Sequence, residues 1–91
     1  MTITIKVPAL WRPLSGGYSR IALQATTVAE ALDELIRQYP QLDSQLFDER
    51  REVNQALNLF VNQEHIRYRG GLTAPLRDGD EVYIVPLITG G

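Results

Sequence analysis

Residues 27–40 read TVAEALDELIRQYP, and this stretch decides the fold that we expect. Thr27 and Glu30 form the Thr-x-x-Glu signature of a helix start, in which each side chain satisfies a free backbone amide of the first turn. Pro40 cannot continue the helix because it has no backbone N–H. Apolar residues recur between these limits at helical spacing, namely Val28, Leu32, Leu35, Ile36 and Tyr39. The stretch therefore predicts one amphipathic helix with a core-facing stripe.

Two strands are expected before this helix. Residues 1–7 alternate between apolar and polar side chains, which is typical of a half-buried strand, and residues 18–25 alternate in the same way. Residues 8–17 between them contain two prolines and two glycines, which interrupt strands. We expect a long hairpin loop there and an antiparallel pair of strands on either side of it.

Three more strands are expected after the helix, at residues 57–61, 66–69 and 81–85. The last is the clearest, because the turn Asp78-Gly79 precedes a run of β-branched and aromatic residues that Pro86 closes. Between the helix and these strands, Leu42, Leu46 and Phe47 indicate another short turn of helix. The charged residues 48–52 then form a solvated loop.

This order of elements predicts a mixed sheet. If the last strand runs parallel to the first and beside it, the chain must cross one face of the sheet, and the capped helix supplies that crossover. We expect an α+β fold of the ubiquitin-like β-grasp kind, a single domain over residues 1–91 with four to five strands covered by one main helix. The other sheet face stays open.

The composition excludes several classes of function. The net charge is −2, so the chain lacks the excess of basic residues that is typical of nucleic-acid-binding proteins. No apolar run approaches the roughly 18–20 residues of a membrane span, and no signal peptide is evident, so we expect a cytoplasmic protein. The chain has no cysteine and a single histidine, His65. Disulfides, cysteine-ligated metals and the usual catalytic triads are therefore excluded, His65 is expected to be a solvated turn residue, and no metal site or catalytic residue is expected.

The last residues, Leu87-Ile88-Thr89-Gly90-Gly91, extend beyond the final strand and are expected to form a flexible C-terminal tail. Five extended residues reach roughly 16–18 Å, far enough to place a carboxylate deep inside another protein. Glycine has no Cβ, so a Gly-Gly end passes a constriction that excludes other dipeptides. In this interpretation the terminal carboxylate is the group that reacts.

Several motifs together resemble those of the ubiquitin-like sulfur carriers, the MoaD/ThiS group. They are PALWRP at 8–13 with Gly16-Gly17, FVNQEHIR at 60–67, GGL at 70–72, DGD at 78–80 and the terminal Gly90-Gly91. The resemblance covers nearly the whole chain and is strongest to the cysteine-biosynthesis carriers of the mycobacterial type.

The resemblance implies that a separate E1-like adenylyltransferase and sulfurtransferase activates Gly91 with ATP and converts it to a thiocarboxylate. It also implies that the carrier itself binds no cofactor and is a protein co-substrate, not an enzyme. It implies as acceptor a cysteine synthase-like enzyme, or else molybdopterin synthase or thiazole synthase. Two alternatives remain, a ubiquitin-like modifier joined to target lysines through Gly91 and an interaction domain with an inert tail.

The open sheet face offers a surface for recognition. Successive side chains of a strand point to opposite faces of the sheet. If Leu59 and Val82 point inward, Phe60, Tyr83 and Val85 therefore point outward. We expect these three, together with Leu87 and Ile88 of the tail, to dock the activating enzyme, because exposed apolar clusters mark partner surfaces. Two alternatives are that residues 42–56 fold over this face, or that a shift of one residue in register exchanges inside for outside.

Overall fold

The computed structural model describes residues 1–87 of the chain. Its strands are β1 (Thr2–Lys6), β2 (Arg20–Gln24), β3 (Leu57–Val61), β4 (Glu64–His65) and β5 (Glu81–Pro86). Its α-helices are α1 (Val28–Gln38) and α2 (Asp43–Leu46). The 3₁₀ turns are η1 (Ala9–Leu14), η2 (Pro40–Leu42), η3 (Ile66–Tyr68) and η4 (Gly71–Thr73). The described helices include none with the length and apolar character that crossing a bilayer requires.

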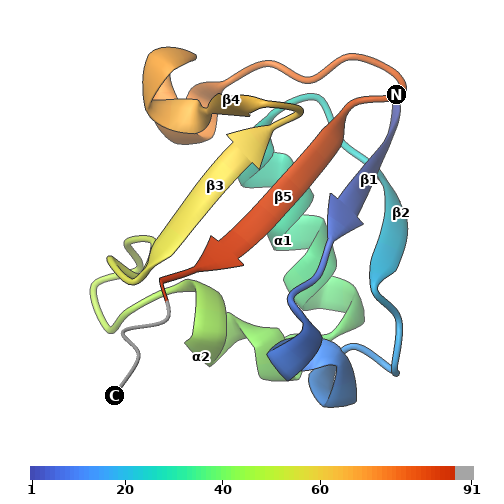
Figure 1. Cartoon of the computed structure of the whole chain (residues 1–91), viewed down its shortest axis with the longest axis vertical. Coiled ribbons are helices and arrows are strands. Elements are labelled where there is room, and N and C mark those ends of the chain that lie inside the picture. Colours follow the sequence, from blue (N-terminus) through green and yellow to red (C-terminus); the bar gives the residue numbers. More distant parts are fainter. Residues whose placement is uncertain (88–91) are drawn as a thin grey trace.

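The five strands form one mixed sheet in the order β2-β1-β5-β3-β4. β1 is antiparallel to β2 and parallel to β5, and β5 is antiparallel to β3. In Figure 1 the sheet lies in front and α1 crosses behind it, as the crossover between parallel strands requires. The predicted mixed sheet with one main helix is thus confirmed.

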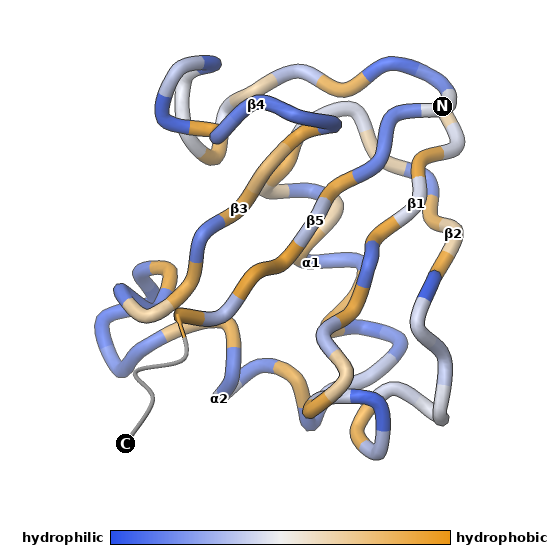
Figure 2. Tube along the Cα trace, in the orientation of Figure 1, coloured by the Kyte–Doolittle hydropathy of each residue, from blue (hydrophilic) through white to orange (hydrophobic). Residues whose placement is uncertain are grey.

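The core lies between the sheet and α1. The inward residues of each strand alternate with outward ones, and the changes of hydropathy along β1 and β2 are visible in Figure 2. From the predicted helix stripe, Val28, Leu32 and Leu35 are fully buried, and Ile36 and Tyr39 pack against the core at its margin. The helix ends at Gln38, as Pro40 predicts.

The loop between β1 and β2 differs from expectation. Residues 9–14 form the 3₁₀ turn η1, and Trp11 at its centre is only 6% exposed because it joins the core. Burying the indole ring removes a large apolar area from water, which outweighs the cost of ordering this proline-containing segment. The predicted long hairpin loop between two antiparallel strands is confirmed, but the 3₁₀ turn within it and the burial of Trp11 were not predicted.

The fourth strand also lies elsewhere than predicted. β4 is Glu64–His65, and the predicted strand residues 66–69 instead begin with the turn η3, in which Ile66 is buried. The reason is the connection from β3, which is only two residues long because Val61 pairs directly with Glu64. Asn62 has a positive φ of 55°, a conformation that asparagine tolerates and that tightens this turn.

The start of α1 is capped as predicted, with one change. The Thr27 hydroxyl accepts the Glu30 N–H at 3.2 Å, but the Glu30 carboxylate reaches one residue further back than the motif implies. It accepts the backbone N–H and the hydroxyl of Thr26, at 2.9 and 2.7 Å. The hydrogen bond from the Thr26 backbone, followed by that from its hydroxyl, lowers the pKa of Glu30.

Replacing Glu30 by glutamine tests this cap. A lowered pKa in the folded state stabilises the protein above the ordinary carboxyl pKa, and the stabilisation is lost as the pH falls through the lowered value. We expect E30Q to have a lower urea midpoint than the wild type at pH 7, and the two midpoints to converge in acid. Asp33→Asn, on the exposed side of the same helix, is the matched control. An equal pH dependence of both variants would contradict the cap.

Candidate functional site

The last described residue marks the root of the tail. β5 ends at Pro86, and the Leu87 N–H donates to the carbonyl oxygen of Ala56 at 2.6 Å. The Leu87 side chain is 55% exposed. The predicted tail residues Ile88, Thr89, Gly90 and Gly91 lie outside the described residues. The structure therefore locates where the tail begins, at the end of a central strand.

The residues predicted to dock a partner lie together on the outer sheet face. Phe60 and Tyr83 are direct partners across β3 and β5, and Val85 follows Tyr83 on the same side of β5. Val85 is 43% exposed, whereas Phe60 and Tyr83 are half-buried. Their neighbours on the opposite face, Leu59 and Val82, are buried in the core. The outward side is as expected, and partner binding by these residues stays a prediction.

The segment between α1 and β3 does not bury the apolar patch, which consists of Phe60, Tyr83 and Val85. Leu42 and Leu46 are fully buried members of the same core that contains the inward strand residues. Figure 1 shows α2 beyond one end of the sheet, close to where β5 finishes. Leu42 and Leu46 therefore pack into the core, and none of Phe60, Tyr83 and Val85 is buried on the outer face.

His65 is built into the edge of the patch. It lies in β4, half-buried, so the expectation of a solvated turn residue was wrong. Its Nδ1 accepts the Arg67 backbone N–H at 3.1 Å, which leaves Nε2 to donate to Asn58 Oδ1 at 3.0 Å. Its ring meets that of Phe60 edge to face, with centroids 5.2 Å apart. His65 thus positions the Phe60 ring, a role that depends on the two-residue turn after β3 and that no sequence motif signals.

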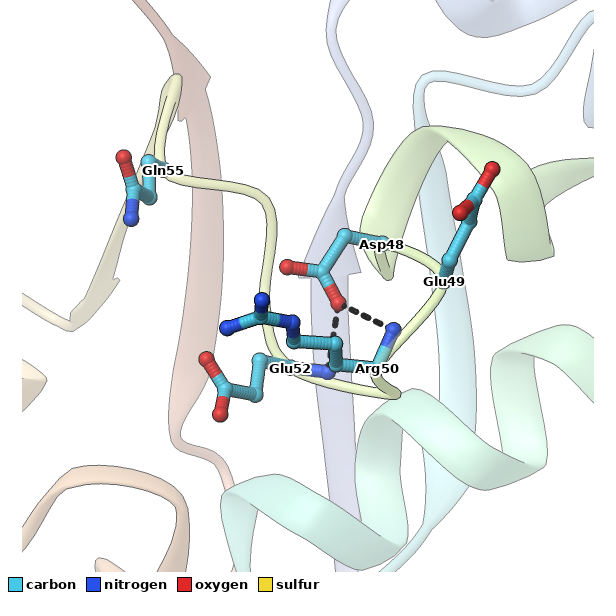
Figure 3. Close-up of a pocket in the computed structure, with 5 residues that line it drawn as sticks. All are labelled: Asp48, Glu49, Arg50, Glu52 and Gln55. Atoms are coloured by element: carbon cyan, nitrogen blue, oxygen red, sulfur yellow. Dashed lines mark hydrogen bonds between the residues drawn. The ribbon is translucent and has the colours of Figure 1, made fainter.

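A second feature adjoins the tail root. Figure 3 shows an open pocket formed by one charged loop, whose lining residues are Asp48, Glu49, Arg50, Glu52 and Gln55. The Asp48 carboxylate accepts the backbone N–H groups of Arg50 and Glu52 at 2.8 and 3.0 Å, so it organises its own loop. This loop is the solvated charged segment that the sequence predicts. It leads into Ala56, the hydrogen-bond partner of Leu87.

The topology and the strand that ends at the tail root define a ubiquitin-like β-grasp protein. The model of the ThiS family matches residues 5–91, and the chain belongs to that family. The sulfur carrier protein CysO of Mycobacterium tuberculosis is 30% identical over 93 residues, with all of both chains covered.

Solved structures agree with this placement. A chain of the Amycolatopsis orientalis BexX/CysO complex superposes with a TM-score of 0.89 at 30% identity, covering 98% of this chain and 99% of that one. The small archaeal modifier protein 1 of Methanosarcina acetivorans gives 0.84 at 30% identity, covering 99% and 96%. Both likenesses therefore cover nearly the whole chain.

Two alanine substitutions test the assignment of sheet faces. Leu59 is 2% exposed, so Leu59→Ala leaves a cavity and should lower the free energy of unfolding by about 2–5 kcal/mol. Val85 is 43% exposed, so Val85→Ala should lower the free energy of unfolding by only about 1 kcal/mol or less. Urea unfolding of both variants measures the difference. A larger loss at Val85 than at Leu59 would mean that the register is shifted by one residue.

Proposed function

We propose that this protein is a sulfur carrier whose terminal residue, Gly91, bears the sulfur as a thiocarboxylate. The observation that supports this most is the family match, which runs through residue 91 and so includes the terminal Gly-Gly. A full-length relative at 30% identity bears the name sulfur carrier protein. In this proposal the protein is a co-substrate of separate enzymes and not itself a catalyst.

The chemistry explains why activation is needed. A terminal carboxyl is an anion at neutral pH and resists attack by nucleophiles. In the proposed sequence a Gly91 carboxylate oxygen attacks the α-phosphorus of ATP, so that an acyl-adenylate forms and pyrophosphate leaves. A hydrosulfide ion then attacks the acyl carbon, AMP leaves with the bonding electron pair, and loss of the S–H proton leaves the thiocarboxylate anion. The resulting thiocarboxylate is a soft nucleophile at neutral pH, as a thiolate is, although the chain has no cysteine.

The described geometry suits this role. The tail begins at Leu87, at the end of β5, and Val85 of the apolar patch lies two residues before it in the same strand. An enzyme that binds the patch therefore also holds the start of the tail. Four further residues lead from Leu87 to Gly91, a reach of roughly 13–14 Å when extended. Recognition and reaction are thus separated, and an E1-like enzyme can do both at once.

We further propose cysteine synthesis as the pathway, with an activated serine as the sulfur acceptor. The support is the similarity to CysO proteins, at 30% identity in both the sequence and the structural comparison. A molybdopterin or thiazole precursor is the alternative acceptor within the same chemistry.

Reconstitution tests the carrier proposal. The protein is incubated with ATP, an E1-like enzyme and a sulfide source, and the masses of the intact protein and of its proteolytic peptides are measured. We expect a gain of about 16 Da, the mass of sulfur minus that of oxygen, on a C-terminal peptide. Deletion of Gly91 should abolish the gain, while Thr89→Ser, which keeps the length of the tail, should retain it. Sulfur on any other residue, or its retention after the deletion, would refute the proposal.

The likeness to a small archaeal modifier protein favours a second candidate, a modifier joined to lysines through Gly91. It uses the same adenylation, but an amine replaces sulfur as the nucleophile and an isopeptide bond forms. Mass spectrometry of the protein purified from cells separates the two. Lysine-linked conjugates support the modifier, and a free thiocarboxylate supports the carrier.

The docking role of the patch has its own test. Val85→Asp and Phe60→Asp each place a charge on the apolar surface, and we expect each to lower the rate of adenylation about 10-fold or more. Ala22→Asp is the matched control, since Ala22 is exposed on the same face but lies on the edge strand β2. Pyrophosphate release measures the rate, and circular dichroism confirms folding. If all three variants react alike, the patch is not the docking surface.

A further inference from the structure

One row of outward side chains crosses all five strands of the sheet. Phe60 pairs with Tyr83 on one side and with His65 on the other, and Tyr83 pairs with Lys6 of β1. Lys6 in turn pairs with Arg20 of β2. The row is therefore aromatic in the middle and on the β4 side, and cationic on the β2 side. The apolar patch is one half of a larger surface.

The two cations of the row are in different situations. Arg20 is compensated, because its guanidinium lies 3.2 Å from the Glu81 carboxylate. The Lys6 ammonium instead lies 5.5 Å from the centroid of the Tyr83 ring. Among residues 1–87, no carboxylate lies within ion-pair distance of Lys6. The outward strand positions thus carry one uncompensated positive charge, although the whole chain has a net charge of −2.

A partner that packs on Tyr83 must also come close to Lys6. The Lys6 ammonium rests over the same ring, so covering the ring takes water away from the charge. A desolvated ammonium is unfavourable unless an opposite charge or hydrogen-bond acceptors replace the lost water. Attraction to the ring replaces only part of this hydration. The arrangement calls for an acceptor on the partner, at the edge of its apolar contact.

We propose that the activating enzyme presents an aspartate or glutamate carboxylate to Lys6, beside the apolar group that contacts Phe60, Tyr83 and Val85. This inference rests on the proposed function, because it takes the patch as the docking surface of that enzyme. The apolar half supplies affinity, and the Lys6 pair fixes the orientation in which the tail enters the active site. The partner surface is thus apolar with an acidic border on the β1 side.

Binding measured at low and high salt tests the charge. Lys6→Glu should weaken binding to the activating enzyme about 10-fold at low ionic strength, and less at high ionic strength, where the charges are screened. Lys6→Arg should bind within about threefold of the wild type because it keeps the charge. Arg77→Glu makes the same change of net charge in the loop before β5 and is the matched control. If Lys6→Glu and Arg77→Glu bind alike at every salt concentration, the acidic contact is refuted.

The chain offers a second, direct readout because Lys6 is its single lysine. A carbodiimide joins an amine to a carboxylate without a spacer, so it should link Lys6 to an acidic residue of the enzyme in the complex. Lys6→Arg should bind but give no such link, since a guanidinium does not react. A complex that adenylates the wild-type carrier but yields no Lys6 link overturns this inference alone. Failure of adenylation overturns the proposed function.

Discussion

The structure depends on the pairing of the last strand with the first. β5 lies between β1 and β3 and completes the sheet from its centre, with the residue pairs Ile5–Val82 and Leu59–Ile84 on its two sides. Parallel pairing with β1 requires the chain to cross one face of the sheet, and α1 makes that crossing with its buried stripe. Because the central strand is also the last element of the fold, the tail begins from a firmly held position.

The same strand serves both faces of the sheet. Val82 and Ile84 are buried in the core, and the residues that alternate with them, Tyr83 and Val85, face outward. A strand cannot exchange these two sets without a shift in register that would bring the core residues into water. The stability of the core therefore fixes which side chains the proposed activating enzyme meets. His65 adds to this by holding the Phe60 ring from the neighbouring strand.

Much of the fold could be predicted because local signals and burial agree. The Thr27 cap, the stripe of α1 and the β-branched run of β5 each specify the element that forms. The misplaced elements lack such agreement. Trp11 is an isolated aromatic residue among prolines and glycines, so no periodicity indicates its burial. β4 follows β3 after a two-residue turn in which Asn62 has a positive φ, and it begins at Glu64, two residues before the predicted start.

The candidate site was predictable to different degrees for a similar reason. The outward direction of Phe60, Tyr83 and Val85 follows from period two alone, whereas the contact between Lys6 and Tyr83 requires knowledge of which strands are neighbours. Residues 77 positions apart in the chain meet only through the parallel register. In the proposed carrier this register places Lys6 beside Tyr83 on the surface that the activating enzyme recognises. The Gly-Gly end is narrow and reactive, but it has no side chains that a partner enzyme could recognise. Specificity must therefore come from the sheet face. An apolar contact alone would leave the orientation of the carrier on the enzyme poorly defined. The charge of Lys6, once buried in the complex, would define that orientation.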